Sequence, residues 1–135
     1  MHLVVIMDNR GKEQIRTRLK QAEESLEDAK ILLVQDAEVN FVMNSLYYAF
    51  LHPVLGLLQV RGIPAPMQST AIGLFEREFV ETGDIDQRFL VAIRKAFELR
   101  PACACEGQMR ATARDVEELL PVAESFLMEI EKLIA

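Results

Sequence analysis

Residues 39–60, VNFVMNSLYYAFLHPVLGLLQV, contain no Lys, Arg, Asp or Glu. An uncharged helix of this length is either buried on most of its sides or inserted in a membrane. Several polar residues and a proline interrupt the segment, and they argue against a membrane span. These residues are Asn40, Asn44, His52, Pro53 and Gln59. We therefore predict that the segment is a buried central helix.

An amphipathic helix is predicted before this segment. Between Gln14 and Val34, apolar residues recur at spacings of three and four, so they form one stripe along a helix. Residues 1–13 are interpreted as a poorly ordered leader. Their apolar run is too short to span a membrane, and no signal-peptide cleavage pattern follows it. The sequence therefore predicts a single helical domain over residues 14–135.

Two further helices are predicted directly after the central one. Residues 61–66, RGIPAP, supply a glycine and two prolines that end the central helix. A third helix is expected from about Gln68 to Val80. Asp84, followed three residues later by Gln87, resembles a capping box and is expected to open the fourth helix.

The last helix is predicted from a second capping signal. Thr112 is followed three residues later by Asp115, and an amphipathic pattern continues to the C-terminus. Pro121 lies within it and is expected to kink the helix or split off its first turns. With no strand periodicity in the chain, the predicted fold class is all-α: an up-down bundle of four long helices plus one shorter helix.

Composition and charge exclude some functions. The chain has 135 residues, with 15 Lys and Arg against 21 Asp and Glu, so it cannot bind nucleic acid by bulk phosphate neutralisation. Local contacts to RNA stay open. Cys103 and Cys105 make no disulfide framework, which favours a reducing, cytoplasmic location. They also provide too few ligands for a structural zinc site, so we predict no metal or cofactor.

One edge of the central helix is polar. At about 100° per residue, five residues fall within a sector of about 80°. They are Ser45, Tyr48, His52, Gly56 and Gln59. The edge either meets a partner or a neighbouring helix, with the imidazole satisfied by hydrogen bonds, or it forms a groove for a ligand or for catalysis.

Three segments resemble a known family. Residues 44–52, NSLYYAFLH, resemble the Asn-Arg-Ala-Tyr-Tyr-Ala-x-x-His signature of prokaryotic HEPN domains. Residues 74–85, LFEREFVETGDI, are similar to a second segment of that family, and residues 98–100 with 115–120 are similar to its C-terminal part. The resemblance covers about residues 14–134. It implies a bundle of four or five helices that is commonly a homodimer, associates with a minimal nucleotidyltransferase or acts as a toxin-type ribonuclease.

The chain also departs from the family pattern. In the ribonuclease members an Arg and a His on one helix face cleave RNA at the dimer groove. Here Ser45 occupies the Arg position, about two turns before His52, and a serine cannot supply a permanent forked charge. Gln68 stands where the family has a His, and Cys103-Ala104-Cys105 stands where it has Ala-Asp-Tyr.

These departures predict a non-cleaving homodimer that engages RNA, a nucleotide or a minimal nucleotidyltransferase in a toxin–antitoxin-like system, without a membrane. The alternative is a metal-independent ribonuclease in which His52 works with a replacement cation, Arg100 or Arg61. A structural dimer without a ligand is the third hypothesis. The positive group nearest the imidazole discriminates between the first two. The expected binding groove comprises Asn44, Ser45, Tyr48, His52, Gln59 and Arg100, and His52 is the candidate catalytic residue.

Overall fold

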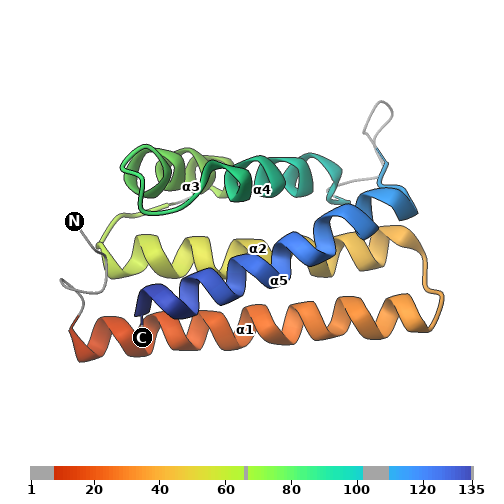
Figure 1. Ribbon diagram of the computed structural model, residues 1–135, viewed down its shortest axis with the longest axis horizontal. Helices are drawn as coiled ribbons and strands as arrows, with labels where there is room; N and C mark the ends of the chain where they lie inside the picture. The colour runs from red at the N-terminus through yellow and green to blue at the C-terminus, as the bar shows by residue number, and fades with distance from the viewer. Residues whose placement is uncertain (1–7, 66, 102–109, 135) are drawn as a thin grey trace.

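The fold is an all-helical bundle, as predicted (Figure 1). The computed structural model describes residues 8–65, 67–101 and 110–134, and within these ranges there is no β-strand. Helices α1, α2 and α5 run side by side along the long axis, while α3 and α4 cover the other side of α2. The elements are α1 (Asn9–Val34), α2 (Val39–Val60), α3 (Gln68–Phe75), the π-helical turn η2 (Glu76–Val80), α4 (Gln87–Leu99) and α5 (Ala113–Ile134).

Helix α2 forms the centre of the core. It contacts α1, α3, α4 and α5, and its most deeply buried side chains include Tyr47, Phe50 and Leu57. Among the described helices it alone is long and apolar enough to cross a membrane, and most of that apolar stretch is buried inside the bundle. Pro53 lies inside α2 without ending it. The uncharged composition of α2 is thus explained by contact with helices on several sides.

Helix α1 begins five residues earlier than the apolar periodicity predicts. The side chain of Asp8 accepts a hydrogen bond from the backbone N–H of Gly11 at 2.7 Å, so Asp8 is the N-cap and the helix starts at Asn9. Part of the predicted leader therefore belongs to the first turns of α1. The rest of that leader, residues 1–7, lies outside the described residues.

The predicted cap of α4 is wrong by two residues. Asp86 accepts a hydrogen bond from the backbone N–H of Arg88 at 2.8 Å and is the N-cap. Asp84 instead accepts a hydrogen bond from the hydroxyl of Thr82 at 2.9 Å. The turn before the helix thus uses the first aspartate, and the second one caps the helix.

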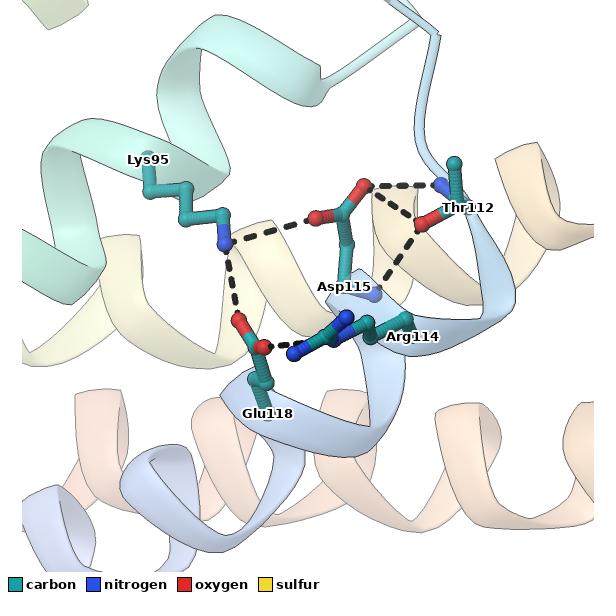
Figure 2. Close-up of polar contacts among 5 residues, drawn as sticks. All are labelled: Lys95, Thr112, Arg114, Asp115 and Glu118. Carbon is teal, nitrogen blue, oxygen red and sulfur yellow. Dashed lines mark hydrogen bonds and ion pairs between the residues drawn. The ribbon is translucent and has the colours of Figure 1, made fainter.

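The predicted capping box of α5 is confirmed (Figure 2). The carboxylate of Asp115 accepts a hydrogen bond from the backbone N–H of Thr112 at 2.8 Å, and the Thr112 hydroxyl accepts one from the N–H of Asp115 at 3.2 Å. Pro121 does not split the helix, which is continuous from Ala113 to Ile134. Both Pro121 and Glu117, whose carbonyl loses its helical donor, are exposed, so water can satisfy that carbonyl.

Candidate functional site

Helices α1 and α2 form an antiparallel hairpin that places Arg18 against Gly56. A β-carbon built on Gly56 would lie 2.9 Å from both Cβ and Cγ of Arg18. Real β-carbons do not approach that closely, so the glycine is what lets the Arg18 stem cross the surface of α2. Gly56, on the polar edge of α2, therefore makes room for the side chain of Arg18.

The head of Arg18 reaches His52, one turn earlier on α2. Its Nη1 atom lies 3.3 Å from Nδ1 of His52. A guanidinium only donates hydrogen bonds, so Nδ1 is the acceptor and the ring proton sits on Nε2. Burial lowers the pKa of His52, the charge of Arg18 lowers it further, and the charge of Glu24 opposes them. The imidazole is therefore neutral at pH 7.

The other predicted groove residues on α2 share this surface edge. Tyr48 is 36% exposed, and its ring centroid lies 6.0 Å from that of His52. Ser45 is half-buried and Asn44 is exposed, one further turn toward the start of α2. The edge thus presents an aromatic ring beside the imidazole, with short polar side chains beyond it.

Gln59 lines an open pocket beside Arg18. The pocket has a volume of about 310 Å³, and none of the described residues that line it is acidic. Nη1 of Arg18 also lies 3.4 Å from Oε1 of Gln21, so the guanidinium joins this pocket to the imidazole. The lining residues are Gln14, Thr17, Arg18, Gln21 and Gln59.

Arg100, the sixth predicted groove residue, belongs to a neighbouring cluster. Its guanidinium lies 3.7 Å from the ring centroid of Phe97 and 5.6 Å from that of Tyr47. The hydroxyl of Tyr47 donates a hydrogen bond to Oε1 of Gln68 at 2.5 Å, and burial raises the pKa of Tyr47 to about 12. Tyr47 meets Tyr48 edge to face at 5.4 Å, so this cluster touches the groove through the paired tyrosines.

Arg61, the other cation expected beside His52, is engaged at the far end of α2. Its guanidinium lies 3.6 Å from Glu78, 4.0 Å from Asp84, and 4.8 Å from the ring centroid of Phe79. The cation beside the imidazole is Arg18 instead. Cys103 and Cys105 lie outside the described residues, and the residues that the structure describes contain no group of three His, Cys, Asp or Glu residues able to hold a metal ion.

Sequence reasoning missed Arg18 because it lies on a different helix from the motif. A signal did exist in the chain. In an antiparallel hairpin with a short turn near residue 36, residue 18 falls opposite residues 55–56, within one turn of His52. The hairpin geometry therefore predicts that a cation near position 18 of α1 lies beside the uncharged edge of α2.

Comparison with known proteins identifies the family. The model of the HEPN domain matches residues 15–133. The chain belongs to the HEPN domain family. This HEPN protein is 32% identical over 115 residues to a UPF0332 protein of Thermotoga maritima, an alignment that covers 85% of this chain and 86% of the relative.

Two archaeal relatives connect this HEPN protein with toxins. Both come from Methanocaldococcus jannaschii and are described as candidate toxins. One is 25% identical over 129 residues, covering 96% of this chain and 87% of the relative. The other is 28% identical over 123 residues, covering 91% and 90%. A toxin-like HEPN family is thus the setting in which the Arg18–His52 pair has to be interpreted.

Proposed function

We propose that this HEPN protein binds RNA or a nucleotide in the groove along α2, with a phosphate on Arg18, and does not cleave it. The observation that carries the proposal is the position of Arg18, 3.3 Å from His52 at the edge of an acid-free pocket. Within the described residues Arg18 forms no ion pair with a carboxylate. Its charge and forked donors are therefore available to a phosphate.

Binding without cleavage follows from the proton chemistry of one protomer. Transfer of a phosphodiester needs one group to accept a proton and another to donate one. His52 is held neutral and can accept, whereas Arg18 does not release its proton. Ser45 adds no charge where the ribonuclease members have Arg. The groove of one protomer therefore contains a cation that binds phosphate, but it lacks a proton donor for cleavage.

The proposal is tested by RNA binding with a matched control. Fluorescence anisotropy of labelled single-stranded RNA should show binding by the wild type and a loss of about tenfold or more in Arg18→Gln, because a charged hydrogen bond to phosphate is removed. Arg16→Gln is the control, since Arg16 lies on the same helix but lines a different pocket, between α1 and α5. Equal affinity in wild type and Arg18→Gln would contradict the proposal.

A metal-independent ribonuclease is the second candidate function. One observation favours it: Arg18 supplies, from another helix, the positive charge that Ser45 lacks. In a homodimer a second imidazole from the partner could provide the missing proton donor. This candidate requires cleavage in the presence of EDTA that depends on both Arg18 and His52, and it is addressed by the first prediction below.

Homodimer formation is part of the proposal. Phe41 is 60% exposed, and it lies on the same edge of α2 as Tyr48, two turns earlier. An exposed apolar face of this kind is typical of a surface that another chain covers. Light scattering should give about twice the 15.3 kDa chain mass, and Phe41→Glu should shift it toward the monomer. Met128→Glu on α5, where the side chain is 59% exposed, is the control. A wild-type monomer at tens of micromolar would contradict this part.

A minimal nucleotidyltransferase partner, a toxin–antitoxin-like role and a cytoplasmic location complete the proposal. The relatives described as candidate toxins support the toxin-like role. If a minimal nucleotidyltransferase is encoded beside this gene, co-expression of the two proteins should give a complex that survives size-exclusion chromatography. Separate elution of the two proteins would contradict the partnership.

A further inference from the structure

We infer that the pocket at the Gln59 end of the groove is a nucleoside subsite, which takes the base and ribose of the nucleotide whose phosphate lies on Arg18. The inference rests on the proposed function and adds the class of group that the pocket recognises. It concerns the α1 side of the groove, which Gln59 borders and the motif at residues 44–52 does not reach.

The lining of the pocket suits a nucleoside. Three glutamines and a threonine surround it, and each glutamine side chain offers an oxygen acceptor and two N–H donors. Base edges and ribose hydroxyls present the same mixture of donors and acceptors. A volume of about 310 Å³ lies at the lower end of the usual range for small-ligand pockets, about 300–1,000 Å³, and suits one nucleoside rather than several.

Charge also selects for such a ligand. The chain has six more acidic than basic residues, yet no described residue lining this pocket is acidic. The pocket between α1 and α5 offers the contrast: Glu23 and Glu131 line it together with Arg16 and Lys20, and burial and the neighbouring Glu131 raise the pKa of Glu23. The two acidic and two basic residues offset one another there, whereas Arg18 is the one charged residue among the described residues that line the Gln59 pocket. One cation matches a monophosphate or a phosphodiester better than a triphosphate.

The position of Arg18 connects the subsite to the rest of the groove. Its Nη1 lies between Oε1 of Gln21 and Nδ1 of His52, while Nε and Nη2 make no hydrogen bond within the described residues. These two nitrogens form a fork able to hold two phosphate oxygens. Gly56 keeps the floor beside the arginine stem flat.

The subsite and Tyr48 flank the phosphate position on opposite sides. Along α2, Gln59 lies about 10 Å beyond His52, and Tyr48 lies about 6 Å before it. One base can therefore enter the amide-lined pocket while the base on the other side of the phosphate stacks on the exposed Tyr48 ring. The groove thus accommodates two successive nucleotides of a single strand.

Nuclear magnetic resonance (NMR) titration of the full chain tests the inference directly, because glutamine side-chain NH₂ groups give their own signals. The probes are AMP, CMP, GMP, UMP, ribose 5-phosphate and inorganic phosphate. We expect at least one nucleoside monophosphate to bind about three- to tenfold more tightly than ribose 5-phosphate, the gain of one or two hydrogen bonds. The NH₂ signals of Gln14, Gln21 and Gln59 should shift with that nucleotide.

Two variants separate the subsite from the proposed function. Gln59→Leu should abolish the preference for the nucleotide over ribose 5-phosphate and leave phosphate binding unchanged. Gln87→Leu, at an exposed glutamine on α4, is the control and should change neither. If Arg18→Gln weakens all probes but Gln59→Leu leaves the preference intact, the subsite is wrong and phosphate binding stands. If no probe binds in an Arg18-dependent way, the proposed function fails and the subsite with it.

Discussion

Arg18 donates a hydrogen bond to Nδ1 of His52 at 3.3 Å, although 34 positions separate the two residues along the chain. The contact requires Gly56, because any larger residue would meet the arginine stem where the helices cross. It also explains how this chain, with Ser45 where the ribonuclease members have arginine, still has a positive charge beside the imidazole of His52.

The first prediction concerns cleavage. Purified wild type should not cleave single-stranded RNA above background in EDTA, whereas Ser45→Arg should gain activity in the homodimer, where the added arginine stabilises charge and an imidazole of the partner donates the proton that one protomer lacks. A group that stabilises charge in the transition state contributes on the order of 100- to 1,000-fold in rate. Denaturing gels with a labelled RNA measure it, and Ser45→Arg combined with His52→Ala is the blank. Wild-type cleavage that is lost in both His52→Ala and Arg18→Gln would establish the ribonuclease instead.

The second prediction concerns pH. Burial and the Arg18 charge lower the pKa of His52 below its ordinary value of 6.5. The unfolded chain then binds this proton more readily than the folded protein, so stability is lost as the pH falls from 6.5 through the folded-state pKa. Arg18→Gln should raise that pKa and make the loss smaller.

Both quantities in this prediction are measurable. The chain has only two histidines, so the imidazole signals in a proton NMR titration are readily assigned with His52→Ala. Urea unfolding at pH 7 and at about pH 5 gives the pH dependence of stability. Arg16→Gln is again the control. A titration of His52 that is identical in wild type and Arg18→Gln would show that the two side chains do not interact in solution.

The third prediction concerns the crossing of α1 and α2. Gly56→Ala should destabilise the protein by about 1–3 kcal/mol, the usual cost of forcing an extra carbon into a packed interface. Gly73→Ala is a matched control, since no atom lies within 4 Å of its added carbon, and better helix propensity should make it neutral or stabilising by up to about 1 kcal/mol. Urea unfolding compares the two, and equal stability would show that the hairpin adjusts freely at Gly56.

The fourth prediction concerns the start of α5. Asp115→Ala should cost about 1 kcal/mol, because it removes the cap on Thr112 and the ion pair to Lys95, 3.3 Å away on α4 (Figure 2). The Thr112 backbone hydrogen bond is the main cause that lowers the pKa of Asp115 below 3.8, so this stabilisation is lost as the pH falls through the folded-state pKa. Thermal unfolding at neutral pH measures the cost. Glu117→Ala, an exposed site on the same helix, should be nearly neutral, and a similar loss in both variants would contradict the role of the cap.

Local signals in the sequence predicted most of the fold. The bounds of α2 follow from its uncharged run, and the start of α5 follows from Thr112 and Asp115, because these patterns depend on neighbours within a few residues. The predicted start of α1 is too late because its cap, Asp8, precedes the apolar stripe. The predicted cap of α4 is wrong because two aspartates compete for that role. Asp84 and Asp86 have the same capping chemistry, and only the path of the turn decides which of them faces the helix N–H groups.

The site was less predictable than the fold. The helical periodicity of α2 predicts that Tyr48, His52 and Gln59 lie on one edge. The cation, however, depends on a contact between two helices, and residue types alone favoured the two arginines near the end of α2 and of α4. Arg61 instead pairs with Glu78 and Asp84, and Arg100 stacks on Phe97. These contacts depend on how the helices pack, which local sequence patterns do not specify.

The α1–α2 hairpin has a consequence for how the site is built. Every residue of the Arg18–His52 groove and of the adjoining pocket lies between positions 14 and 59, on two successive helices joined by a short turn. Because the turn between the two helices is short, the hairpin closes with little loss of loop-closure entropy, although the Arg18–His52 contact itself spans 34 positions. The groove can therefore take shape before the C-terminal half docks. Mutations in α3, α4 and α5 can accumulate over evolutionary time, provided that the core stays filled, without altering the chemistry that the hairpin presents.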